Sequence, residues 1–230
     1  MSPNFYKKLY TPQRVVEAFQ RALTEENPLS LVSLGNGEII FLAYPEIPGF
    51  EKLPPVPSGI DPYRKYISDQ TIRTEILEAV RHADIIGIPA PLYTGRWPEA
   101  EFFFEHYSLQ VELVCDAYIG RLLHNEGILY EKLKNKRIVL LGNNALNLVP
   151  VLEKHQIELV GHTGVDYFED IPRVKSFLEQ TDFEMAIISA GVPSLILAPW
   201  IAKKLGRCAL DFGCAVHYLN LDPVSSRNRG

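Results

Sequence analysis

Residues 137–144 read RIVLLGNN, a short apolar run that ends in a glycine turn. Helical spacing follows through Leu146, Val149 and Leu152, and a second apolar run begins at residue 157. Apolar runs of this length predict strands that are buried on both faces. Because the intervening helix carries the chain back across the sheet, two such strands are expected to be parallel.

The same alternation of strand and helix runs through most of the chain. Further strands are predicted at residues 29–34, 84–89, 111–115, 157–160, 185–189 and 207–211, and helices at 11–27, 71–82, 97–107, 117–133, 144–155 and 194–205. This order predicts the α/β class, with a Rossmann-like, mainly parallel sheet that carries helices on both faces.

The length and composition favour one folded domain over residues 1–230. Hydrophobic residues make up 47% and charged residues 22% of the 230 residues, which excludes a disordered chain, a collagen and a coiled coil. Residues 45–62 contain six prolines, so a long loop is predicted there, either a lid over a site or a surface insertion.

Charge and cysteine content exclude several classes of partner. The net charge is −5 and no basic block is present, which disfavours nucleic acid. Three cysteines without CxxC spacing suggest neither a disulfide scaffold nor a zinc ribbon, so a reducing cytoplasm is expected. No apolar run approaches the ~18 residues that are needed to span a bilayer. The sequence does not determine the oligomeric state.

Four turns follow predicted strands, at residues 35–38, 142–144, 190–194 and 211–213. Ligands of open parallel sheets collect at the carboxyl ends of strands, and glycine lets the backbone approach an anion closely. The four turns are therefore predicted to surround one phosphate-bearing ligand, although each alone is equally consistent with a purely structural turn. The predicted contacts are Gly35, Asn36, Gly37, Gly142, Asn143, Gly191 and Ser194.

Familiar site motifs are missing from these turns. None matches GxGxxG or the P-loop pattern, and Ser194 lacks the GxSxG context of a serine hydrolase. The six histidines show no zinc-site spacing.

Two acids and one histidine are the candidate catalytic residues. Glu38 lies one turn past a strand, where it would hold a cation or simply start a helix. Asp211 ends the last strand and is either a base or hydroxyl acceptor or a loop-closing acid. His217 follows closely and is either functional or a surface residue. Arg73 and Arg121 are candidate phosphate partners, but solvated helix faces are the stronger reading.

The order of these motifs resembles the GT-D-type glycosyltransferases, bacterial enzymes with a Rossmann-like sheet. Residues 33–38 (SLGNGE) are similar to the family's glycine-flanked DxE element, and residues 138–144 to its second strand and turn. Residues 188–194 (ISAGVPS), with 210–213 (LDFG) and His217, resemble its closing G-P-[ST] and D-[IF]-G…H segments. The resemblance spans residues 30–218.

The resemblance implies transfer of a sugar, hexose or N-acetylhexosamine, from a nucleotide-sugar donor such as a UDP-sugar. The implied acceptor is a hydroxyl of a bacterial cell-surface glycan, a glycoprotein or a lipid-linked saccharide, the last of which would place the chemistry at the inner face of the membrane. The family's aspartate helps to hold Mn²⁺ or Mg²⁺, whereas this chain has Asn36 in that place. An amide is a weaker ligand, so a divalent cation held by Glu38 and Asn36 is in doubt.

Two other functions are also consistent with parts of the sequence. Asn36 also fits a non-catalytic nucleotide-sugar or phosphosugar-binding module, which would bind without turnover. The unit over residues 137–160 has the shape found in oxidoreductases and methyltransferases, but it lacks their glycine spacing.

Overall fold

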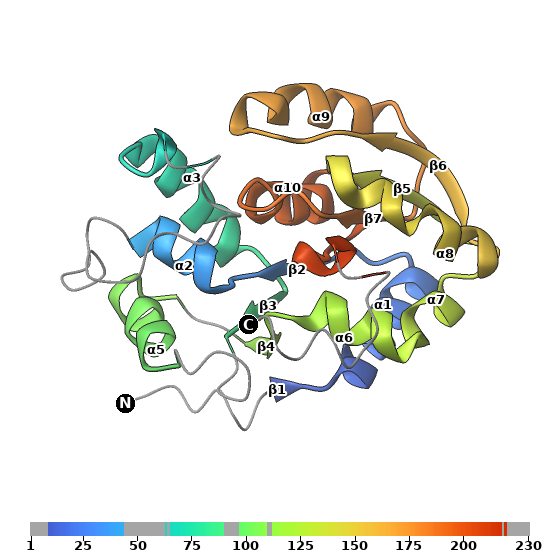
Figure 1. Ribbon diagram of the computed structural model, residues 1–230, viewed down its shortest axis with the longest axis horizontal. Helices are drawn as coiled ribbons and strands as arrows, with labels where there is room; N and C mark the ends of the chain where they lie inside the picture. Colours follow the sequence, from blue (N-terminus) through green and yellow to red (C-terminus); the bar gives the residue numbers. More distant parts are fainter. Residues whose placement is uncertain are drawn as a thin grey trace.

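The computed structural model describes residues 9–43, 63, 65–89, 97–109, 112–217 and 219. These residues form one 8-stranded sheet in which neighbouring strands are hydrogen-bonded in the order β1-β4-β3-β2-β8-β7-β5-β6. Figure 1 shows this order from β1 at the bottom to β6 at the top. Every neighbouring pair is parallel, which confirms the predicted α/β class and mainly parallel sheet.

The strands have these bounds: β1 Leu9–Tyr10, β2 Leu29–Ser33, β3 Ile85–Ile88, β4 Leu113–Asp116, β5 Arg137–Leu141, β6 Glu158–Thr163, β7 Met185–Ile188 and β8 Cys208–Asp211. The α-helices are α1 Pro12–Glu25, α2 Asn36–Ala43, α3 Gln70–Arg81, α5 Trp97–His106, α6 Ile119–Glu126, α7 Ile128–Lys132, α8 Val149–Lys154, α9 Ile171–Glu179 and α10 Ser194–Trp200. Shorter helical turns are η4 Asn143–Leu148, η5 Phe168–Asp170, η6 Ile201–Leu205 and η7 Gly213–His217.

Two apolar cores cover the two faces of the sheet. One core contains buried side chains of α2, α3, α5, α9 and α10. The other contains those of α1, α6, α7, α8 and η7. Helices therefore lie on both faces, as predicted.

Local signals explain where several helices begin and end. Thr11 Oγ1 accepts a hydrogen bond from the Arg14 N–H at the start of α1, and Pro12 takes the first helical position. Asp69 caps α3 in the same way. Gly127, with φ of 70°, separates α6 from α7, so the helical region predicted over residues 117–133 is two helices.

Other predictions need adjustment. The helix after Gly142 begins as the 3₁₀ turn η4, and the helix from Ser194 ends in the π-helical turn η6 just after Pro199. Strand β6 extends to Thr163, beyond its predicted end, and α9 was not predicted. The predicted loop at residues 45–62 lies outside the described residues. In the described part of the chain, no helix has the length and apolar character needed to cross a bilayer.

Candidate functional site

The four predicted turns follow four strands that are neighbours in the sheet: β2, β8, β7 and β5. Because these strands are parallel, their carboxyl ends lie at one edge. The chain then leaves alternately to opposite faces, through α2 and α10 on one side and η7 and η4 on the other. Open parallel sheets bind ligands outside the carboxyl ends of strands whose connections diverge in this way.

Glu38 is the third residue of α2, and its side chain turns back toward the start of the helix. The carboxylate accepts hydrogen bonds from the backbone N–H groups of Glu38 and Gly35. This is the glutamate half of a capping box, with Gly35 at the N-cap. A Cβ at Gly35 would stand 2.8 Å from Glu38 Oε2, so the glycine makes room for the carboxylate. Burial nevertheless raises the pKa of Glu38.

Asp211 forms hydrogen bonds with residues at the ends of β2, β7 and β8. Its side chain is 3% exposed. Oδ2 accepts from the Ser33 N–H of β2 at 3.0 Å, and Oδ1 accepts from the Gly213 N–H at 3.0 Å. Burial raises the pKa of Asp211 to about 7, and the charge of Glu38 adds to the rise. The two N–H groups and the Ser194 hydroxyl oppose it. Both oxygens are engaged by the protein, so the geometry fits an acid that positions the turns.

Glu38 and Asp211 therefore belong to one site. The thiol of Cys214, in the first turn of η7, lies within electrostatic reach of both acids and of Arg121. Arg121 comes from α6, which packs so closely on the end of β8 that a Cβ at Gly120 would stand 2.3 Å from the Phe212 carbonyl oxygen.

The structure separates the two arginines that the sequence analysis considered together. Arg121 is half-buried beside the site. Arg73 is only 3% exposed, so the expected solvated helix face is wrong for this residue. Its guanidinium lies on α3, which packs mainly against α10.

The glycines of the turns have structural reasons to be glycine. Gly142 has φ of 112°, and a Cβ there would stand 2.0 Å from the Ser189 carbonyl oxygen of the neighbouring turn. Gly191 has φ of 61° and faces the Tyr63 hydroxyl, 3.0 Å from its Cβ position. Ser194 is fully buried, and its hydroxyl accepts a hydrogen bond from the Ala190 N–H at 3.3 Å. Gly37 lies in the first turn of α2, beside Glu38.

Two further predicted residues are exposed on the same edge. Asn143 begins η4, and its amide Nδ2 donates to the Asp166 carboxylate. His217 ends η7 with its side chain in solvent. An amide that already donates to a carboxylate is better placed to contact a sugar hydroxyl than a phosphate.

Sequence reasoning missed Tyr63 and Asp116. The Tyr63 hydroxyl donates to the Ala190 carbonyl at 2.8 Å, and burial followed by the charge of Glu38 raises the pKa of Tyr63. Asp116 ends β4, is 5% exposed, and accepts the Tyr118 N–H at 2.7 Å; burial raises its pKa. A signal was available for Asp116, because LVCD at 113–116 ends in aspartate as CALD at 208–211 does.

A family model for a GT-D fold-like domain matches residues 10–219. The chain belongs to the GT-D-like family. This finding confirms the resemblance and the fold type expected from residues 33–38, 138–144 and 188–217. No curated protein matches the chain.

Two solved structures resemble the GT-D-like chain. One is the selenomethionine-substituted structure of domain of unknown function 1792, with a TM-score of 0.58 and 14% identity over 90% of this chain and 78% of that chain. The other is a structure of the same domain, said to have a distinct glycosyltransferase fold, with a TM-score of 0.57 and 13% identity over the same shares. At such identities the likeness shows the fold.

The residues at the DxE-like element do not fit a resident divalent cation. Asn36 offers a neutral oxygen, and the Glu38 carboxylate is engaged by the N–H groups at the start of α2. Among the residues that the structure describes, no three His, Cys, Asp or Glu side chains gather closely enough to hold a metal ion.

Proposed function

We propose that this GT-D-like chain is a glycosyltransferase that moves a hexose or N-acetylhexosamine from a UDP-linked donor. The proposed acceptor is a hydroxyl of a bacterial cell-surface glycan, a glycoprotein or a lipid-linked saccharide, reached from the cytoplasmic side of the membrane. One observation carries the proposal: in a chain of the GT-D-like family, Glu38 and Asp211 follow neighbouring strands and interact at the carboxyl end of the sheet.

In the proposed reaction, the acceptor hydroxyl attacks the anomeric carbon of the donor sugar. A C–O bond forms there, the bond to the diphosphate breaks, and the nucleoside diphosphate leaves. The hydroxyl proton passes to Glu38, because a carboxylate with a raised pKa is a better base near neutral pH than an ordinary one. Asp211 holds the turns in register through Ser33 and Gly213, and His217 contacts sugar from the rim.

Negative charge grows on the departing diphosphate and needs a positive partner. Arg121 is the proposed partner, since its charge reaches the first turn of η7 beside both acids. Backbone N–H groups around Gly37 and Gly191 are the proposed additional donors.

Two substitutions of Glu38 test the proposal. Gln at this position retains the side-chain oxygen that caps α2 but cannot take a proton, whereas Ala removes both. We expect Glu38→Gln to melt near wild type and to release the nucleotide, which is UDP, GDP or CMP according to the donor, at least ~100-fold more slowly from a panel of UDP-, GDP- and CMP-sugars. Glu38→Ala should lose that activity and also about 1 kcal/mol of stability.

The outcomes separate the rival functions. Release by Glu38→Gln at the wild-type rate would show that Glu38 only caps the helix, and the site assignment would be wrong. Nucleotide sugars would raise the melting temperature of a binding module, but such a protein would release no nucleotide from them. Running each assay with Mn²⁺ and with EDTA tests the poor fit of Asn36 and Glu38 to a cation.

A further inference from the structure

A group of exposed side chains lies beside the four turns, at the carboxyl ends of β5 and β6. It consists of Lys65, Asn143, Asp166 and Tyr167, and we name it the Tyr167 surface. Tyr167 is 41% exposed, and the other three are also exposed. A single exposed ring is ordinary on a protein surface. The hydrogen bonds and the cation–π contact that hold these side chains in place distinguish this surface.

The loop that carries Asp166 and Tyr167 is fixed by hydrogen bonds. Asp170 Oδ2 accepts from the N–H of Asp166 at 3.0 Å and from that of Tyr167 at 3.2 Å. Arg173 donates to Asp170 Oδ1 at 2.9 Å and to the Gly164 carbonyl at 2.8 Å. A loop ordered in advance loses less conformational entropy when it binds a ligand.

The exposed side chains are also held in place. Asn143 Nδ2 donates to Asp166 Oδ1, and Asn143 Oδ1 lies only 2.2 Å from the position of a Cβ at Gly164, so a side chain at residue 164 would displace this amide. The Lys65 ammonium lies 4.6 Å from the centre of the Tyr167 ring, a cation–π distance. Lys65 also pairs with Glu169 at 3.5 Å.

Tyr63 links this surface to Glu38 and to the turn after β7. Its hydroxyl donates to Ala190 in the turn after β7, and its phenol lies within electrostatic reach of Glu38, Asp166 and Tyr167. Tyr63 therefore lies between the Tyr167 surface and Glu38, within electrostatic reach of both.

The chemistry of the surface favours a neutral ligand with both apolar and hydroxyl groups. An aromatic ring offers an apolar face to the C–H side of a sugar ring, while carboxylate and amide groups pair with hydroxyls. The negative charge of Asp166 disfavours a phosphate on this surface, and Lys65 is already paired with Glu169.

We propose that the Tyr167 surface binds a neutral pyranose ring during the reaction, an inference that rests on the proposed glycosyl transfer. The ring stacks on Tyr167, and its hydroxyls bond to Asp166 and Asn143. The ring belongs either to the acceptor or to the sugar of the donor, which share this chemistry, and the experiment separates the two.

Saturation-transfer NMR on the full chain with methyl glucoside, methyl galactoside and methyl N-acetylglucosaminide tests the proposal. We expect at least one of them to bind wild type, and Tyr167→Ala to weaken that binding about tenfold. Tyr167→Phe, which retains the ring, should bind close to wild type. Phe102→Ala is the matched control, since Phe102 is 47% exposed on α5 and should leave binding unchanged.

Parallel titrations with UDP and UDP-glucose identify the source of the ring. In Tyr167→Ala, weaker binding of UDP-glucose with unchanged binding of UDP assigns the ring to the donor, and weaker binding of the glycosides with unchanged binding of UDP-glucose assigns it to the acceptor. The proposal is overturned if neither changes, if Phe102→Ala loses binding equally, or if wild type binds none of the sugars. Wild type that binds glycosides but no nucleotide or nucleotide sugar would keep the surface and overturn the proposed function.

Discussion

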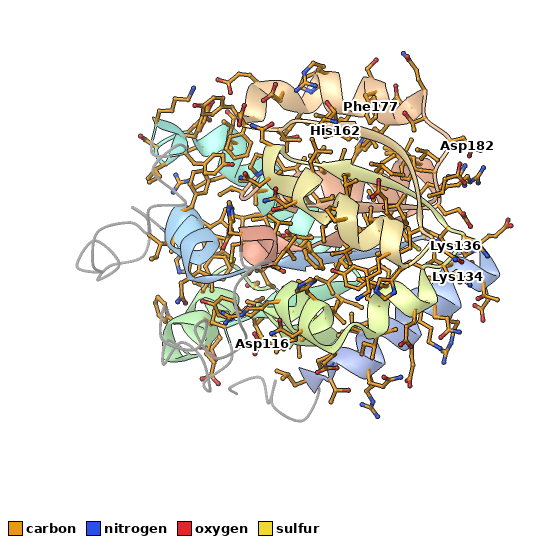
Figure 2. The ribbon with its side chains drawn as sticks, turned by 45° about the vertical axis from the view of Figure 1, so that its right-hand side comes forward. Asp116, Lys134, Lys136, His162, Phe177 and Asp182 are labelled. Carbon is orange, nitrogen blue, oxygen red and sulfur yellow. The ribbon has the colours of Figure 1, made fainter. Side chains whose placement is uncertain are left out.

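Acidic residues at the two ends of the strands have opposite electrostatic environments. At the amino ends of β5, β7 and β8, Glu184 pairs with Lys136 at 2.7 Å, and Asp182 pairs with Arg137 and Arg207. At the carboxyl ends lie Glu38, Asp116 and Asp211, whose pKa values are raised by burial. Figure 2 labels Lys136 and Asp182 at one end of the molecule and Asp116 toward the other.

The direction of each pKa shift follows from this difference. Burial alone would raise the pKa of Glu184, but the hydrogen bonds and charges of Lys136 and Arg137 lower it overall. Ionised acids at that end are matched by cations, which is a structural use of charge. Acids that bind protons more tightly are found at functional sites, so the carboxyl end is where we expect the chemistry.

The largest effect should come from the backbone of the carboxyl end. Gly142→Ala places a Cβ 2.0 Å from the Ser189 carbonyl at φ of 112°, and strain with overpacking should cost roughly 3–5 kcal/mol. Gly206→Ala is the control before β8, because φ is 64° there but no atom lies within 4 Å of the Cβ. It should cost about 1–2 kcal/mol in urea unfolding. Equal losses would mean that the close approach of the turns is unimportant.

The next effect is the pH dependence of Asp211. A raised pKa means that the folded state holds the proton more tightly, so stability is present at low pH and is lost as the pH rises. Between pH 3.8, the usual pKa of an aspartate, and about pH 7, the raised pKa of Asp211, the free energy of unfolding of wild type should fall relative to that of Asp211→Asn. The expected decrease is about 1.4 kcal/mol per pH unit. Urea unfolding of both proteins from pH 4 to 7 measures the difference. A constant difference would show that Asp211 stays ionised when folded.

The smallest effect, of opposite sign, should come from Glu184. Its pKa is lowered, so its contribution is present above the usual value of 4.5 and is lost as the pH falls. Glu184→Gln should cost about 0.5–1 kcal/mol at pH 7, less at high salt, and nothing near pH 3. Diphosphate release from nucleotide sugars should be unchanged. A stability cost that grew toward low pH would remove the contrast between the two ends.

Patterns along the chain were sufficient for the strands but not for the side chains between them. The run at 137–141 predicted β5 with its observed bounds, because a buried strand has a local signature. The burial of Arg73 and the pairing of Asn143 with Asp166 involve residues from separate elements, which no local pattern records. Of the two readings of Glu38, the structure shows the carboxylate at the helix start, while its interaction with Asp211 depends on strand order and had no local signal.

Sequence alone determined the strand and helix alternation, the parallel sheet and the four turns that follow its strands, because apolar spacing and glycine punctuation are local properties. Tertiary structure decided that β2, β8, β7 and β5 are adjacent, and hence that Glu38 raises the pKa of an acid far along the chain. It also decided that Asp211 is enclosed by N–H groups while Asp166 and Tyr167 remain in solvent. Strand order and burial depend on how the entire chain packs. They determine the pKa of each acid and the groups that each side chain can contact.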